Sequence, residues 1–201
     1  APDRSHGPGF YTRNRASWPQ KRLRDNIIFQ HYRQGLQGYG SFTNVFSNFL
    51  VQGNIVFNNG VGRNGLHRNL MFGNDNTEHV QNIFLENFTY FPPGEGQGSN
   101  MFASPGGGCR GLFLLGNVFA HGPGRTAAAI HHCEDVEISG NLFYGRTKYS
   151  GPAGTIEAEG AEFERLFPEN RYLGDETGPP LETISFARRN LYEPNRAHIV
   201  I

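Results

Sequence analysis

The chain has 201 residues, with 18 Lys and Arg against 18 Asp and Glu, so its formal net charge is zero. This balance argues against binding to nucleic acid or to anionic membranes, which both need a basic excess. No stretch reaches the roughly 18 unbroken apolar residues of a membrane span. Charged residues are only 18% of the chain, and 27 Gly and 12 Pro favour short strands joined by tight turns.

Residues 1–22 come before any repeat, and we expect them to form an entry segment. The chain begins with Ala1 rather than Met, which is compatible with processing. Its two cysteines neither establish nor exclude an oxidising compartment. We expect an extracellular or periplasmic location. No phosphate-binding loop or dinucleotide fingerprint occurs, so we expect no cofactor.

A short repeat, apolar-x-x-Asn-x-apolar, follows from residue 23 onward. Four copies are clear: Leu23–Ile28, Val51–Val56, Leu114–Phe119 and Ile138–Phe143. The copy at Phe84–Thr89 is poorer and fits best with a slip of one residue, and two weaker copies follow at Phe167–Tyr172 and Ala187–Tyr192. Their asparagines lie at positions 26, 54, 87, 117, 141, 170 and 190. Consecutive asparagines are therefore 20 to 33 residues apart. Repeats of this length are typical of folds in which each repeat stacks on the previous one.

The repeated segments alternate like strands. Val136 and Ile138 are separated by the polar Glu137 and Ser139, which is a two-residue period. Such strands fit either an antiparallel fold or a parallel solenoid. The recurring Asn favours the solenoid, because stacked coils repeat the same turn at the same place. Asn tolerates the left-handed backbone conformation of such a turn, and stacked Asn side chains can form a hydrogen-bonded ladder.

The two cysteines lie at equivalent positions of their repeats. Cys109 and Cys133 each precede the Asn of their copy by eight residues. In a solenoid they therefore stack on adjacent coils, about 4.8 Å apart. That separation allows a disulfide, and it equally allows two reduced, buried thiols. In either case the sequence predicts that the two cysteines are neighbours.

We therefore predict an all-β fold, a single right-handed parallel β-helix of about seven coils over residues 23–192. The Gly53-Asn54, Gly116-Asn117 and Gly140-Asn141 pairs at the strand ends resemble those of the parallel β-helix superfamily that includes pectate lyases. The resemblance implies the fold and a role on polysaccharides. Residues 193–201 are expected to form a terminal apolar strand without a cap, which leads into a missing C-terminal region or contacts another copy.

The sequence departs from the enzymes of that superfamily. It lacks the Trp-x-Asp-His and Arg-x-Pro-x-x-Arg segments of pectate lyases. It also lacks the Asn-Thr-Asp, Asp-Asp and Gly-His-Gly signatures of polygalacturonases. Whether the chain is an enzyme is therefore left open; if it is one, the resemblance implies a polysaccharide lyase or a glycoside hydrolase.

Register alignment predicts one polar trough on the outside of the coils. The residues brought there from three consecutive coils are Glu78, His79, His131, His132 and Glu134, with the Gly107-Gly108 pair as its floor. His79, His131, His132 and Arg110 are the candidate catalytic residues, because imidazoles act as general bases near neutral pH and a lyase can use an Arg near the cleaved bond. Glu78, Glu134 and Asp75 are the candidate substrate-binding residues.

Simpler interpretations of the same residues stay open. The trough can be a hydrated polar face that contains histidines. Arg110 and Glu134 both precede their Asn by seven residues and can form a cross-coil ion pair. We predict no metal site, because no pair among these residues has a ligand spacing specific to a metal. The segment around Asp75 lacks the frame of a calcium loop.

Two functions follow. The first is a secreted parallel β-helix that binds or processes polysaccharide, without a recognisable catalytic set. The alternative is a non-catalytic structural protein that assembles end to end into fibres through open coil ends. The expected partners are thus polysaccharide or further copies of the chain, with neither nucleic acid nor membrane. A fold resemblance alone does not decide between these functions.

Overall fold

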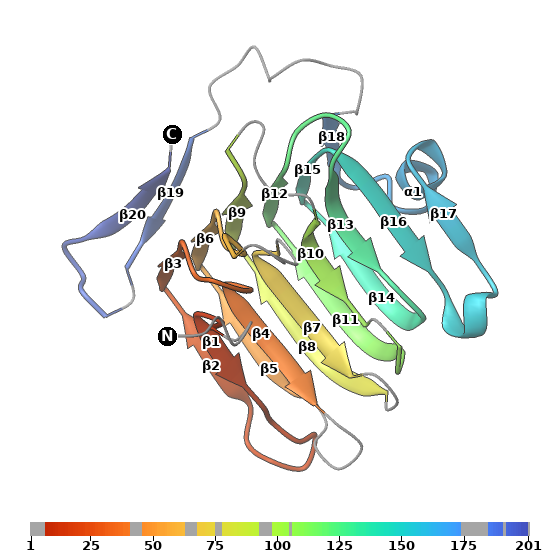
Figure 1. Cartoon of the computed structure of the whole chain (residues 1–201), viewed down its shortest axis with the longest axis horizontal. Helices are drawn as coiled ribbons and strands as arrows, with labels where there is room; N and C mark the ends of the chain where they lie inside the picture. Colours follow the sequence, from red (N-terminus) through yellow and green to blue (C-terminus); the bar gives the residue numbers. More distant parts are fainter. Residues whose placement is uncertain are drawn as a thin grey trace.

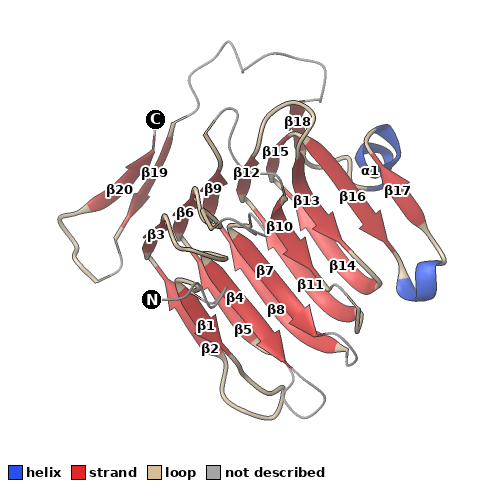
Figure 2. Ribbon diagram, viewed as in Figure 1, coloured by secondary structure: helices blue, strands red, loops and turns tan. Residues whose placement is uncertain are grey.

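The computed structural model describes residues 7–40, 46–62, 68–74, 78–92, 98–104, 106–173, 185–190 and 192–200. Within these ranges the regular structure is almost entirely β-strand, and the strands follow one another around stacked parallel coils (Figures 1 and 2). The predicted all-β parallel solenoid is therefore confirmed. Among the described residues, no helix has the length and apolar character needed to cross a membrane.

Three sheets form the sides of the coils. Sheet 1 contains β1 (Phe10–Thr12), β4 (Leu36–Gly40), β7 (Leu70–Asn74), β10 (Ser99–Ala103), β13 (Thr126–Ile130), β16 (Arg146–Ser150) and β17 (Glu157–Glu159). Sheet 2 contains β2 (Lys21–Arg24), β5 (Phe49–Gln52), β8 (His79–Leu85), β11 (Cys109–Leu115) and β14 (Cys133–Ser139). Sheet 3 contains β3 (Ile27–Phe29), β6 (Ile55–Phe57), β9 (Phe88–Tyr90), β12 (Val118–Ala120), β15 (Leu142–Tyr144) and β18 (Arg171–Leu173). Neighbouring strands pair in parallel, except that β17 is antiparallel to β16.

The solenoid has about five turns, fewer than the seven predicted. Five turns carry one strand in each sheet, and the last strands, β16 and β18, begin a sixth. The copy at Ala187–Tyr192 is not a coil, because β19 (Phe186–Arg189) pairs antiparallel with β20 (Ala197–Val200). Asn190 accepts the backbone N–H groups of Tyr192 and Glu193, so it closes the turn of its own hairpin.

The predicted Asn ladder joins six asparagines, one from each of the five turns and one, Asn170, just before β18. From Asn26 to Asn170, each side-chain amide donates to the next Oδ1 at 2.8–2.9 Å. The expectation that Asn itself adopts the left-handed conformation is wrong. The positive φ falls on the residue before it, as in Asp25 (54°), Gly53 (65°) and Glu86 (53°). The turn therefore needs both residues, one for the backbone bend and one for the hydrogen bonds.

The bore of the solenoid is filled by stacked aromatic and aliphatic side chains. The largest fully buried ones include Phe46, Phe49, Phe72, Phe84, Phe119 and Phe143. Burying each such side chain contributes about 1.5–3 kcal/mol. At the C-terminal end of the bore, helix α1 (Ala161–Leu166) inserts the buried Phe163, whose ring lies 5.6 Å from that of Phe143. This end of the hydrophobic core is thus covered by the helix.

The β19–β20 hairpin packs against the outside of the coils, beside sheet 3 (Figure 1). Val200 contacts an apolar cluster formed by Ile55, Phe88 and Val118, whose side chains point outward from sheet 3. The strand expected within residues 193–201 is therefore present as β20. It does not extend the stack of coils, because it folds back onto their outer face.

The cysteines are neighbours, as predicted. Cys109 and Cys133 are register partners in β11 and β14, with their Cα atoms 4.4 Å apart, and they form a disulfide. Of the two alternatives, the structure thus shows the bonded one. The bond joins two adjacent coils at the start of sheet 2, directly beside the predicted trough.

Candidate functional site

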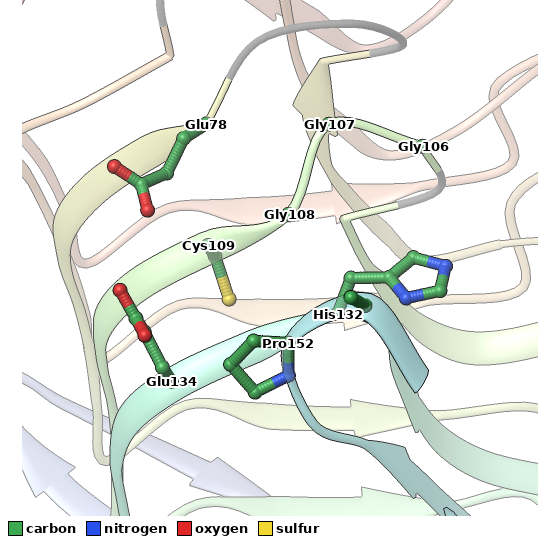
Figure 3. A pocket seen from close by; sticks show the side chains of 9 residues that line it. Glu78, Gly106, Gly107, Gly108, Cys109, His132, Glu134 and Pro152 are labelled. Atoms are coloured by element: carbon green, nitrogen blue, oxygen red, sulfur yellow. The ribbon is translucent and has the colours of Figure 1, made fainter. Parts of the chain in front are cut away.

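A pocket of about 380 Å³ lies where the chain enters sheet 2 (Figure 3). Its lining comes from the residues just before or at the start of β8, β11 and β14, and from the 3₁₀ turn η1 (Pro152–Gly154). The lining residues are Glu78, Gly106, Gly107, Gly108, Cys109, His132, Glu134, Pro152 and Ala153. Stacked parallel coils place equivalent corners above one another, so polar residues from three coils meet here.

Glu78, Arg110 and Glu134 form a column of alternating charge beside the pocket. Arg110 Nη2 lies 2.8 Å from Glu78 Oε2, and its Nε lies 3.9 Å from Glu134 Oε1. The predicted stacking of Arg110 and Glu134 is confirmed, since they are register partners. All three side chains are about half exposed, so the pairs contribute only about 0–1 kcal/mol each. In Figure 3 the carboxylates of Glu78 and Glu134 point toward one another across the strand of Cys109.

The floor of the pocket depends on glycine. Gly108 and His132 occupy equivalent corners and both have a positive φ, 78° and 53°. A Cβ atom at Gly108 would lie 2.9 Å from the carbonyl oxygen of His132, so a larger residue would push the coils apart. His132 donates its backbone N–H to Ser150 Oγ at 2.9 Å, while its buried Nδ1 has no hydrogen-bond partner. A left-handed non-glycine residue stores strain, and here it orients an imidazole into the pocket wall.

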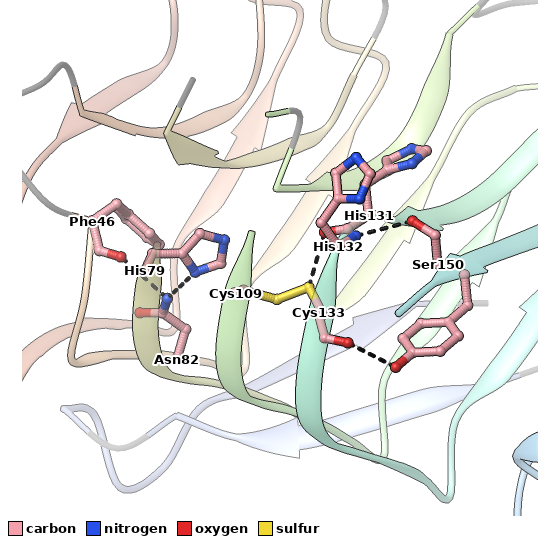
Figure 4. The surroundings of a disulfide bond; sticks show 9 residues. Phe46, His79, Asn82, Cys109, His131, His132, Cys133 and Ser150 are labelled. Carbon is pink, nitrogen blue, oxygen red and sulfur yellow. Dashed lines mark hydrogen bonds between the residues drawn. A yellow bond between two sulfur atoms is a disulfide. The ribbon is translucent and has the colours of Figure 1, made fainter. Parts of the chain in front are cut away.

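His79 is not part of this pocket, which corrects the predicted trough. Its side chain is only 1% exposed and points into the bore, where it packs edge-on against Phe46 (Figure 4). Nδ1 lies 2.8 Å from Asn82 Nδ2, and the buried Nε2 has no partner. Burial lowers the pKa of His79 to about 3. A ring held neutral inside the core cannot exchange protons with a ligand in the pocket.

His131 lies on the other side of the corner from the pocket. Its ring packs against Phe102 on the outer face of sheet 1, with 5.1 Å between ring centroids, and lies 6.3 Å from the ring of His132. Burial, followed by the positive charges of His132, Lys148 and Arg68, lowers the pKa of His131. The trough therefore divides into a pocket that contains His132 and a separate outer face that contains His131.

The remaining site predictions are placed as follows. Asp75 lies outside the described residues. Within the described ranges, no group of three His, Cys, Asp or Glu residues is arranged to hold a metal ion. Pro152 and Ala153 were missed by the sequence analysis, although the Gly151-Pro152-Ala153-Gly154 run is a turn signal. They form the rim of the pocket opposite the glycines.

No protein-family profile, curated protein or solved structure matches this chain.

Proposed function

We propose that this chain is a polysaccharide-binding parallel β-helix domain of the pectate-lyase-like kind, and that the pocket at the start of sheet 2 is its glycan site. The observation that carries the proposal is the column of Glu78, Arg110 and Glu134 at the pocket. Acceptor, donor and acceptor groups come from three consecutive coils. Adjacent coils are about 4.8 Å apart, which is close to the length of one sugar residue. A repeating polymer can therefore meet a polar group at each successive unit.

The charges of the pocket favour a hydroxyl-rich, uncharged polymer. The two carboxylates of Glu78 and Glu134 outnumber the single guanidinium of Arg110, so the column beside the pocket carries a net negative charge. A polyuronate would be repelled by this charge, whereas sugar hydroxyls donate to carboxylates and accept from Arg. The site thus suits a neutral glycan better than the acidic substrate of a lyase.

Binding is better supported than cleavage. A glycosidase uses two carboxyl groups and needs one of them as a general acid, whereas Glu78 and Glu134 both face the guanidinium of Arg110. Arg110 still has N–H donors to spare, because its five donors exceed the two contacts with the carboxylates and its side chain is about half exposed. In this arrangement the column holds and orients hydroxyl groups, and Pro152 and Ala153 supply an apolar rim for one edge of a sugar ring.

A secreted or periplasmic location is part of the same proposal. The Cys109–Cys133 disulfide supports it, because disulfides persist in oxidising compartments and are rare in the cytosol. Extracellular glycans are then accessible to the pocket.

Affinity electrophoresis and calorimetry against neutral polymers (glucan, mannan, xylan) and polyuronate test the proposal. We expect a neutral polymer to bind, and Glu78→Gln or Glu134→Gln to weaken binding about tenfold each, as for loss of one charged hydrogen bond. Glu162→Gln is the matched control, because Glu162 is an exposed, Arg-paired glutamate on α1. If no polymer binds, or if all three variants behave alike, the proposal fails. Mass spectrometry of the incubated polymers shows whether any bond is cut.

A further inference from the structure

A second polar cluster lies on the outer face of sheet 1. Arg68, just before β7, places its Cζ 3.8 Å from the centroid of the Phe102 ring in β10. Phe102 points outward because its neighbours Met101 and Ala103 are buried in the core and side chains alternate along a strand. Such close stacking on an aromatic face is favourable and fixes the position of the guanidinium.

Arg68 has no carboxylate partner among the described residues. Within the described ranges, its guanidinium makes one weak hydrogen bond, from Nη1 to Met71 Sδ at 3.5 Å, and its buried Nε has no partner. Burial lowers the pKa of the Arg68 guanidinium to about 10, so the group is still charged at neutral pH. A partly buried charge without a counter-ion is costly, and an arriving anion would relieve that cost.

His131 reaches the same aromatic ring from β13. The positive charges of His132, Lys148 and Arg68 act on the His131 imidazole. In the part of the chain that the structure describes, the acidic group that acts on it is Glu159 of β17, which already pairs with Lys148 at 2.6 Å. The field at this face is therefore positive, unlike the acidic field of the pocket on the other side of the corner.

We propose that Arg68 and His131, arranged around Phe102, form a binding subsite for an oxyanion. The guanidinium offers a fork of N–H donors that matches the two oxygens of a carboxylate, sulfate or phosphate group. His131 adds a hydrogen-bond donor when it is protonated. Protonation of His131 therefore increases the affinity for the anion, and a bound anion increases the affinity of His131 for the proton. The subsite is independent of the glycan pocket, because it binds an anion whereas the pocket binds an uncharged polymer.

Anion titrations followed by NMR test this subsite in the chain of 201 residues. Sodium phosphate, sodium sulfate and sodium acetate are added at constant ionic strength, and the ring resonances of His131 are monitored. We expect saturable shifts with at least one anion, and tighter binding as the pH falls and His131 gains its proton. The three salts distinguish which oxyanion the subsite prefers.

Variants separate a subsite from nonspecific attraction. Arg68→Lys keeps the charge but loses the fork, and we expect about tenfold weaker binding. Arg13→Lys is the control, because Arg13 also lies over an aromatic ring, that of Tyr11, on an exposed strand. His131→Gln, followed through the ring resonances of Phe102, which contacts Arg68 and the residue at position 131, should keep binding near neutral pH and lose its pH dependence. Circular dichroism establishes that each variant is folded. Shifts that do not saturate with any salt, or that survive Arg68→Lys unchanged, would overturn the proposal.

Discussion

Asn87 and Asn117 are joined by two hydrogen bonds to a single oxygen. Asn117 Oδ1 accepts the side-chain amide of Asn87 at 2.9 Å and its backbone N–H at 3.0 Å. Asn117 in turn donates to Asn141 Oδ1 and to the carbonyl oxygen of Phe84. Both side chains are fully buried. The ladder thus satisfies backbone groups at the corner between sheets 2 and 3, where strand pairing is interrupted.

Asn117→Ala should therefore destabilise the fold strongly. The change leaves the backbone N–H of Asn87 and the carbonyl of Phe84 without their buried partners, and each such group costs about 1–3 kcal/mol. We expect a loss of about 3 kcal/mol in the free energy of unfolding, measured by urea denaturation. Asn26→Ala is the control, because Asn26 ends the ladder and is only partly buried. Equal losses for the two variants would contradict a cooperative ladder.

The disulfide should stabilise the fold mainly by restricting the conformations of the unfolded chain. Cys109 and Cys133 are 24 residues apart, and closing a loop of that length contributes about 3 kcal/mol in the chain-entropy model. We expect the Cys109→Ala/Cys133→Ala double variant to unfold at a correspondingly lower urea concentration. Alkylation of the denatured, unreduced protein provides the check: labelling of both thiols would show that the bond is absent.

Arg188 links the C-terminal hairpin to the coils through two ion pairs. Its Nε lies 3.0 Å from Asp25 Oδ1 and its Nη1 lies 2.6 Å from Glu86 Oε2, and the side chain of Asp25 is fully buried. A Cβ atom at Gly53 would collide with the guanidinium, so the glycine provides the space for it. We expect Arg188→Gln to cost about 3 kcal/mol, because it removes the cation from a buried carboxylate.

Hydrogen exchange of β19 and β20 provides the measurement for Arg188→Gln, since a detached hairpin loses its amide protection. Arg196→Gln is the matched control, because the Arg196–Glu193 pair is exposed and such pairs contribute about 0–1 kcal/mol. Unchanged protection of the hairpin in Arg188→Gln would show that the apolar contacts of Val200 are sufficient.

The sequence was enough to predict the coils because their signals are local and repeated. The Asn column and the two cysteines share one register, and only stacked parallel strands satisfy both. The copy at Ala187–Tyr192 was misleading for the same reason: six residues look like a coil, yet Asn190 bonds within its own hairpin. A second set of hydrogen-bonded asparagines, Asn59–Asn69–Asn100, was not predicted, because its members are 10 and 31 residues apart and show no regular repeat.

The candidate site was predicted only in part, because side chains do not keep their regular inward and outward alternation at the corners between strands. Gly108 and His132 adopt left-handed conformations there, and each such residue changes the face on which the next side chains lie. Glu78, His132 and Glu134 therefore meet in the pocket, whereas His79 turns inward. The Arg68–Phe102 contact joins residues 34 positions apart and has no motif to reveal it.

The buried His79 should make stability depend on pH. In the unfolded chain its pKa is about 6.5, whereas burial lowers it to about 3 in the fold. Between these values the unfolded state binds the proton and the folded state does not. Stability is therefore complete above about pH 6.5 and falls as the pH decreases toward 3, by up to about 1.4 kcal/mol per pH unit. Below that range the folded protein also binds the proton, and the dependence flattens.

His79→Gln isolates this contribution, because glutamine does not titrate. We expect urea denaturation at a series of pH values to show a shallower acid dependence for His79→Gln than for the native sequence. His198→Gln, in the hairpin strand β20 outside the bore, serves as the control for the loss of an imidazole. Identical slopes for His79→Gln and the native protein would mean that the imidazole reaches solvent and protonates in the folded state. The inward orientation that removes His79 from the pocket would then be incorrect.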